Sequence, residues 1–389
     1  MMASARVIYL HCNTSWNWYF QKFAAALQTP GTKVELVEFH HGSKVEWIEG
    51  AFDGSVPGRR FGRPLQVRSP VRVFREFERL WHRVLRNGDR RQLRHYLAQG
   101  DITHFVAADP WALKFCVKAA ARNHARVYYL PLEQYRHEPG GGEKRKQEVL
   151  RLEREFIPQA NGTIVLGDSI AEQHLRLYGG KDRLHVVHNG WPLDMKPRRK
   201  ALRQAAGLPS GQIVVLYTGF ICPEKGVFDV VEAMAHLPDS VSFVIVGFGD
   251  TAEVEARART AGVSDRVIIL PAVPQKDLMD YIVDADIGVV PFRKETVHIF
   301  GCPGKLYEFM AAGLPLADSD TTDMRDLVSK HRLGEVFEAG QPADLARAVQ
   351  TLAQSSEYRR QCAENSRLAH QNTFCWDLQS RKLASIILG

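Results

Sequence analysis

Two lysines and a glutamate in the second half of the sequence occupy positions suited to binding a phosphorylated ligand. In FGCPGKLYEFMAAGLPL, residues 300–316, a glycine-proline-glycine turn precedes an apolar helical run that carries Lys305 at its start and Glu308 three residues later. A second turn, TGFICPEKG, brings Lys225 to the start of another helical run, VFDVVEAMAHL. The first N–H groups of a helix are unpaired, so a helix start with a nearby lysine can bind an anion such as phosphate.

Together the two helix starts predict a diphosphate site. Two cations at corresponding strand ends of one domain suit a diphosphate better than one does, and the N–H groups near Gly304 and Leu306 would face the same ligand. Glu308, one turn further on, can accept hydrogen bonds from a vicinal diol such as a ribose. Alternatively, the lysines are only solvated and Glu308 is a solvated or capping acid; the residue types alone leave both interpretations open.

The elements that would position these side chains alternate along the chain. Short apolar runs typical of buried strands are separated by helical patterns, which predicts right-handed βαβ units and parallel sheets. We therefore expect an α/β fold with two doubly wound, Rossmann-like domains whose strand ends face a shared cleft. The expected strands lie at 6–10, 33–39, 102–108, 125–133, 162–167, 184–190, 213–219, 241–247, 266–273, 287–292 and 315–320.

The length of 389 residues also favours two domains, because single cores usually stop growing near 250–300 residues. Residues 189–212 are rich in proline, glycine and charge and are the best candidate linker. We expect domains over residues 1–192 and 193–374.

The composition is that of an ordinary globular protein, with 45% hydrophobic and 24% charged residues. No apolar stretch approaches the roughly 20 residues that span a bilayer, and the N-terminus lacks the pattern of a signal peptide. The six cysteines are scattered without a CxxC pair, and no carboxylate cluster for a divalent metal is visible. These features predict a cytoplasmic protein without a metal or a cofactor.

The net charge of +7 is concentrated in one segment. Six arginines at helical spacing predict a basic stripe along one side of a helix, opposite apolar residues. Such a helix could rest on an anionic membrane surface, which would place the protein at the inner face of the cytoplasmic membrane, or it could be a packed helix with a solvated face. No nucleic-acid-binding motif accompanies the charge. The stripe consists of Arg72, Arg75, Arg79, Arg83, Arg86 and Arg90.

Residues 213–376 resemble the donor-binding domain of GT-B glycosyltransferases, specifically retaining family 4, also called group 1. The resemblance rests on YTGFICPEKG, FVIVGFGD, DRVIILPAVPQKDLMDYIVDADIGVVPF and CPGKLYEFMAAGLPLADSD, in that order. The final helical run, 375–389, resembles the family's C-terminal helix, which packs back on the first domain. The resemblance implies that residues 1–192 bind the acceptor and residues 193–374 bind a nucleotide-sugar donor.

The resemblance also implies roles for individual residues. Lys225 matches the family's lysine on the donor diphosphate, Glu308 the glutamate that holds the ribose, and Lys305 a P-x-K-x-x-E variant that contacts phosphate. Val273 and Pro274 match the position of the base. The implied donor-binding residues are Gly219, Lys225, Gly247, Val273, Pro274, His298, Gly304, Lys305, Leu306 and Glu308.

Three positions depart from the family pattern. Phe220 stands where the family often has an arginine, Phe300 replaces the acid that usually binds the transferred sugar, and Leu132 replaces a histidine beside Glu133. Glu295 and His298 lie close enough in sequence to offer sugar contacts instead. The implied catalytic candidates are Glu308, Lys305 and Glu133, and the implied acceptor-binding candidates are Asn13, Trp16 and Glu133.

The resemblance implies a metal-independent, retaining transfer of a sugar from a nucleoside diphosphate to a glycan, a lipid-linked saccharide or another hydroxyl acceptor. A UDP-sugar is the favoured donor and a GDP-sugar the alternative. Given the departures, a non-catalytic relative that only binds nucleotide sugars is the main rival, followed by an epimerase or a phosphorylase. A nicotinamide oxidoreductase is disfavoured, since VGFGDTAE lacks the third glycine of G-x-G-x-x-G.

Overall fold

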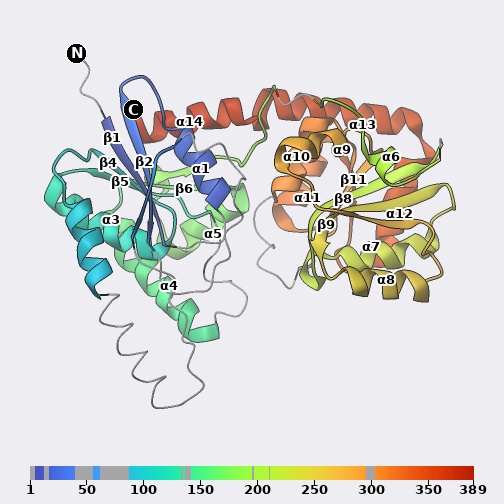
Figure 1. The fold of residues 1–389 in the computed structure, drawn as a ribbon, viewed down its shortest axis with the longest axis horizontal. Helices are drawn as coiled ribbons and strands as arrows, with labels where there is room; N and C mark the ends of the chain where they lie inside the picture. Colours follow the sequence, from blue (N-terminus) through green and yellow to red (C-terminus); the bar gives the residue numbers. More distant parts are fainter. Residues whose placement is uncertain are drawn as a thin grey trace. The chain divides into compact units, whose positions relative to one another are not determined.

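The computed structural model divides the chain into two compact units (Figure 1). It describes residues 5–12, 17–39, 56–61, 87–132, 135, 142–194, 197–209, 211–294 and 303–389. Unit 1 contains residues up to Val165, together with Ala171–Val187 and Ser380–Gly389. Unit 2 contains Leu166–Ile170 and His188–Gln379. Each unit is therefore assembled from more than one stretch of the chain.

Unit 1 is built on a parallel sheet in the order β3-β2-β1-β4-β5-β6-β7. The central strands are almost fully buried, as expected for short apolar runs in a parallel sheet. The order reverses between β1 and β4. The strands are β1 Ala5–His11, β2 Thr32–Phe39, β3 Gly58–Phe61, β4 His104–Ala107, β5 Arg126–Tyr129, β6 Gly162–Val165 and β7 Leu184–Val186.

Helices cover both faces of this sheet. One face packs through Ile8, Leu10 and Phe105 against α3 and α4, and α1 packs against Tyr9 on the other (Figure 1). Residues 87–97 are also helical, so the last position of the arginine stripe, Arg90, lies on a helix; residues 72–86 lie outside the described residues. The helices are α1 Asn17–Ala25, α3 Pro110–Asn123, α4 Gly142–Phe156 and α5 Asp168–Tyr178, with 3-10 turns at Ile157–Gln159 and Lys181–Arg183.

Unit 2 contains a second parallel sheet in the order β10-β9-β8-β11-β12-β13. Its order reverses between β8 and β11, and such switch points are where open α/β sheets bind ligands, at the carboxyl ends of the strands. The strands are β8 Ile213–Ile221, β9 Val241–Gly249, β10 Val267–Pro271, β11 Ile287–Val290, β12 Leu316–Ser319 and β13 Gly334–Phe337.

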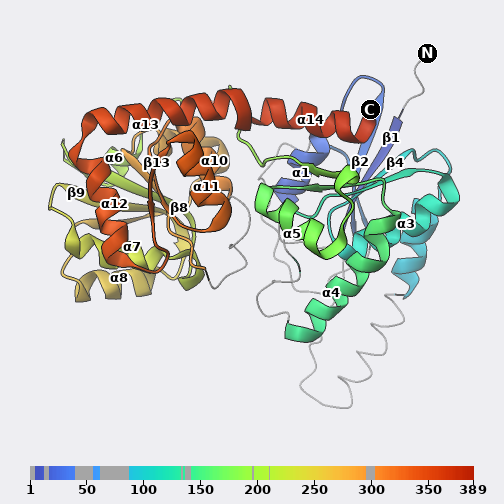
Figure 2. The same ribbon diagram turned by 180° about the vertical axis from the view of Figure 1, so that it is seen from behind.

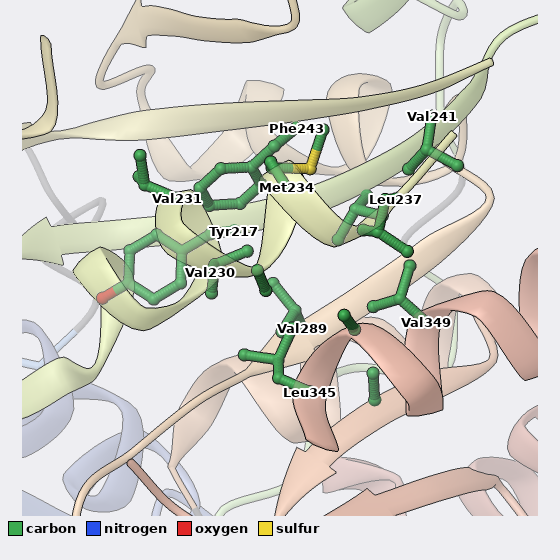
Figure 3. Close-up of a cluster of buried hydrophobic side chains, with 14 of the residues drawn as sticks. Tyr217, Val230, Val231, Met234, Leu237, Val241, Phe243, Val289, Leu345 and Val349 are labelled. Atoms are coloured by element: carbon green, nitrogen blue, oxygen red, sulfur yellow. The ribbon is translucent and has the colours of Figure 1, made fainter. Parts of the chain in front are cut away.

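The two faces of the second sheet carry separate apolar clusters. Tyr217, Phe243 and Val289 pack against α7 and α12, where Leu345 and Val349 complete the cluster in Figure 3. The opposite face packs against α9, α10 and α11, and Figure 2 shows both layers. The helices of unit 2 are α6 Leu202–Ala205, α7 Val227–Ala233, α8 Thr251–Thr260, α9 Gln275–Ile282, α10 Gly304–Ala312, α11 Thr322–His331, α12 Pro342–Gln354 and α13 Ser356–Ala369, and α14 Trp376–Leu388 begins in unit 2 and continues into unit 1. Shorter turns lie at Pro223–Lys225 (η4), Met234–His236 and His370–Phe374.

The segment expected to be a linker is attached to unit 2. Arg203 forms an ion pair with Asp286 at 2.6 Å, and its backbone N–H donates to Asp284 at 2.9 Å. The backbone N–H of Arg198 donates to Asp280 at 2.6 Å. Residues 197–209 are thus held against α9 and the strand that follows it.

The prediction of two doubly wound α/β sheets is confirmed. Among the described residues, none of the helices combines the length and the apolar character needed to cross a bilayer.

Candidate functional site

Helix α10 brings Lys305 and Glu308 to the carboxyl ends of the unit 2 strands. Its inner side is fixed by Leu306, Tyr307 and Phe309, which are fully buried. A Cβ atom at Gly288 of β11 would lie 2.5 Å from the ring of Phe309, so glycine at this position allows α10 to pack directly on the strand. The first turn of α10 is therefore held rigidly beside the switch point.

Two lysines share an aromatic neighbour at this point. The Lys305 Nζ lies 3.7 Å from the centroid of the Tyr217 ring and 5.0 Å from that of Phe292. The Lys225 Nζ lies 4.3 Å from the Phe292 centroid. Cations over aromatic faces are attracted by the ring quadrupole, so Phe292 and Tyr217 hold both ammonium groups at the edge of the sheet.

The turn that carries Lys225 is tethered to the end of β11. Gly226 has a φ of +66°, and a Cβ atom there would lie 1.7 Å from the carbonyl oxygen of Pro291, so only glycine fits. The backbone N–H of Arg293 donates to the carbonyl of Glu224 at 3.3 Å, and its guanidinium pairs with Asp229 on α7. The local backbone thus holds the turn of Lys225 beside the end of β11.

The electrostatics of the pair favour an anionic ligand. Burial lowers the pKa of Lys305 well below its ordinary value, and the charge of Lys225 lowers it further. Glu308, Cys222 and Asp318 act in the opposite direction. A bound anion would stabilise both ammonium groups and raise the pKa of Lys305.

Asp318 on β12 is a buried acid that the sequence analysis did not single out. Its side chain is fully buried, and neither carboxyl oxygen has a hydrogen-bond partner among the described residues. Burial raises its pKa well above the ordinary value, while Lys305 lowers it. Burial thus favours the neutral form of Asp318, while the nearby charge of Lys305 favours the ionised form. An aspartate within the apolar strand LADS was the available signal.

The predicted donor-binding glycines lie side by side. Gly219 and Gly247 are register partners on β8 and β9, and a Cβ atom at Gly247 would lie 2.0 Å from the carbonyl oxygen of Gly219. Gly219 has a φ of +114°, and a Cβ atom there would lie 3.8 Å from the Nζ of Lys305. Because glycine has no side chain, the backbone at these positions is not covered next to the Lys305 ammonium group.

The other predicted site residues are distributed as follows. Val273 is half-buried and Pro274 exposed, just before α9 and two strands away from β8. Leu306 is fully buried in the core, so only its backbone is left to contact a ligand. Four predicted residues lie outside the described residues, namely His298, Asn13, Trp16 and Glu133, and so do Glu295 and Phe300. Among the residues that the structure describes, no group of His, Cys, Asp or Glu side chains could hold a metal ion.

Unit 1 has a buried acid at its own switch point. Asp109 caps α3, accepting from the N–H of Ala112 at 2.8 Å and from that of Cys12. It is fully buried, and burial raises its pKa from 3.8 to about 6, although the backbone hydrogen bonds act in the opposite direction. Sequence reasoning missed this residue, whose only signal was a capping acid before Pro110.

Asp109 is expected to make unit 1 less stable as the pH rises. The folded pKa is raised above the unfolded one, so this contribution is fully present below about pH 4 and is lost as the pH rises to about 6. A difference of about two pKa units corresponds to about 3 kcal/mol. Urea unfolding of wild type and Asp109→Asn between pH 4 and pH 7 measures it, since the variant should lack this component. Parallel pH profiles of the two proteins would contradict the expectation.

Comparison with known proteins identifies a family over part of the chain. Residues 198–369 match the family model described as glycosyl transferases group 1. A D-inositol 3-phosphate glycosyltransferase of Xylanimonas cellulosilytica is 29% identical over 239 residues, which cover 58% of this chain and 56% of that protein. One from Mycobacterium bovis is 33% identical over 201 residues, covering 48% and 42% respectively. The chain thus matches about half the length of these curated relatives.

Solved structures match over nearly the whole chain. Sucrose-phosphate synthase from Thermosynechococcus elongatus superposes with a TM-score of 0.75 at 18% identity, covering 98% of both chains. Anabaena HepE in complex with UDP-glucose has a TM-score of 0.71 at 17% identity, again covering 98% of both. At these identities the likeness shows the fold alone, and it agrees with the resemblance of the sequence motifs. Residues 198–369 therefore resemble the group 1 glycosyl transferases, within a chain that has the GT-B fold.

Proposed function

We propose that the protein transfers a sugar from a nucleoside diphosphate donor, preferably a UDP-sugar, to a hydroxyl group of a saccharide or lipid-linked acceptor. The observation that carries this proposal is the pair Lys225 and Lys305, which lies around Phe292 at the switch point of unit 2. Preorganised positive charge at this position suits a diphosphate, whose negative charge grows as it leaves the sugar. The family match over residues 198–369 supports the same reading.

In this proposal unit 2 binds the donor. The diphosphate lies against the two ammonium groups and the first N–H groups of α10, and Glu308 accepts hydrogen bonds from the ribose hydroxyls. Val273 and Pro274 lie near the base. The binding of UDP-glucose by HepE, which has the same fold, supports a UDP-sugar as the first donor to test.

The proposed chemistry is a retaining transfer. The bond between the anomeric carbon and the diphosphate oxygen breaks, and the acceptor oxygen bonds to the same face of the sugar. The acceptor proton passes to the leaving diphosphate, so no separate metal or cofactor enters the scheme. The acceptor is proposed to bind unit 1, and the names of the curated relatives make inositol 3-phosphate one compound to include among candidate acceptors.

A binding and product assay tests the proposal. Titration with UDP, GDP, ADP and dTDP, and with the corresponding sugars, is expected to show tight binding of one diphosphate. Incubation of that nucleotide sugar with candidate acceptors should then give a glycoside with retained anomeric configuration. Absence of nucleotide binding would refute the proposal. Binding without transfer to any acceptor would favour a non-catalytic protein that binds nucleotide sugars. Phe220, at a position where relatives often carry arginine, is the departure that makes this second outcome the main alternative.

A further inference from the structure

Two phenylalanines stand exposed beside each other at one end of the unit 2 sheet. Phe220 on β8 and Phe248 on β9 are 48% and 55% exposed. Their ring centroids are 5.4 Å apart, and their planes meet at 58°. The two residues are register partners, so the backbone itself fixes the spacing of this Phe220–Phe248 pair. Exposed apolar surface rimmed by polar groups commonly marks a binding site.

The pair stands on a part of the sheet that extends beyond its neighbours. Strand β10 pairs with β9 only as far as Gly247, and β11 pairs with β8 only as far as Leu216. On the same two strands, the face of Leu216 and Val246 is covered by α9 and α10. Both helices begin at this edge, since they follow β10 and the end of β11. The Phe220–Phe248 pair therefore lies at the edge of the sheet where both helices begin.

The pair also borders the lysine site. Gly219 precedes Phe220, and a Cβ atom at Gly219 would lie 3.8 Å from the Nζ of Lys305. In the other direction, β10 leads to Val273 and Pro274. Strands β8 and β10 are two strand spacings apart, about 10 Å, and β9 with Phe248 lies between them. A ligand that reaches from Lys305 to Pro274 would cross the end of β9, the strand that carries Phe248.

We propose that the Phe220–Phe248 pair forms an aromatic platform for the nucleobase of the donor. The base stacks on the ring of Phe248, and the ring of Phe220 contacts the same base from the side. This inference rests on the proposed function, because it takes the diphosphate to be bound at Lys305 and Lys225. A base presents a flat π face, which two tilted aromatic rings can contact by face and by edge. A sugar ring lacks such a face. The aromatic pair thus supplies affinity for the nucleoside, while the lysines supply affinity for the diphosphate.

Calorimetric titrations of wild type and Phe248→Ala with UDP and with pyrophosphate separate these contributions. Base–aromatic stacking is worth about 1–3 kcal/mol, so Phe248→Ala should bind UDP roughly 5- to 150-fold more weakly. Its affinity for pyrophosphate should stay within about twofold of wild type. Phe248→Trp should retain UDP binding, and the fluorescence of the new indole should fall when UDP is added, which a purely structural role would not produce.

Leu368 on α13 offers a matched control, because it is another exposed apolar side chain of unit 2, at 44%. Leu368→Ala should leave UDP affinity unchanged. Unchanged UDP affinity in Phe248→Ala would overturn the platform while leaving the proposed function intact. Weaker binding of UDP-glucose but not of UDP would also overturn it, since the rings would then contact the sugar. If wild type bound neither UDP nor pyrophosphate, both the proposed function and this inference would fail.

Discussion

Replacing Lys305 with alanine is expected to weaken UDP binding by about ten- to a hundredfold. Hydrogen bonds to charged groups contribute about 1.5–3 kcal/mol, and 1.4 kcal/mol corresponds to a factor of ten in affinity. The same loss should appear with pyrophosphate, because Lys305 is proposed to contact the diphosphate rather than the nucleoside. Isothermal titration of both ligands measures the effect.

Thermal unfolding distinguishes this loss from misfolding. Burial lowers the pKa of Lys305, so the folded protein holds this ammonium group at a cost in stability. Lys305→Ala should therefore unfold at the same temperature as wild type or at a higher one. Lys330, an exposed lysine in the last turn of α11, provides the matched control, and Lys330→Ala should bind UDP normally. Normal UDP affinity in Lys305→Ala would remove the main support for the proposed donor site.

Proton uptake offers a second measurement on the same residue. An anion next to Lys305 raises its pKa, so UDP binding should draw a proton from the buffer at pH values where free Lys305 is partly neutral. Titrations in buffers of different ionisation enthalpy report this uptake. It should disappear in Lys305→Ala.

Glu308→Gln is expected to weaken UDP binding by about ten- to a hundredfold and to abolish discrimination between ribose and deoxyribose. Glu308 is buried on α10, one turn after Lys305, where a carboxylate could accept from vicinal hydroxyls. Each charge-assisted hydrogen bond contributes about 1.5–3 kcal/mol. Wild type should therefore prefer UDP to 2′-deoxy-UDP, and the variant should bind the two with nearly equal affinity.

This comparison isolates the ribose contact from an electrostatic side effect. Glu308 also raises the pKa of Lys305, so its removal weakens the lysine's charge for every diphosphate alike. Only the ratio of UDP to 2′-deoxy-UDP affinity reports the hydroxyl contact. Glu255, an exposed glutamate of α8, serves as the control, and Glu255→Gln should leave the ratio unchanged. Retention of the preference in Glu308→Gln would place the ribose elsewhere.

The sequence predicted the interior of both sheets because buried parallel strands are short apolar runs. The two strands it missed, β3 Gly58–Phe61 and β13 Gly334–Phe337, lie at the outer edges. Edge strands have one unpaired side and less buried surface, so GRRF and GEVF show neither the apolar run nor the alternation that marks a strand. Edge pairing depends on the neighbouring strand more than on the residues themselves.

The candidate site was predictable only where local geometry determines it. Lys225 and Lys305 each lie at or beside the start of a helix that follows one of two adjacent strands, β8 and β11, so their convergence follows from the βαβ pattern. The Phe220–Phe248 pair and the neighbourhood of Asp318 arise from register between strands that are distant in sequence. Spacing along one chain segment does not report that register. The sequence shows Phe220 as a departure from the family pattern, but it does not show that the ring of Phe248 lies beside it.

The division of the chain into units has a consequence for biosynthesis. Unit 1 needs Ser380–Gly389, whose Leu383 and Ile387 are fully buried, whereas unit 2 ends at Gln379. During translation the sheet of unit 1 emerges before unit 2 but lacks its final helical segment until residues 380–389 have been made. Unit 2 has all its residues ten codons earlier. Unit 1 is thus completed after unit 2, and nascent chains stalled before residue 380 should expose the apolar surface that Leu383 and Ile387 would cover.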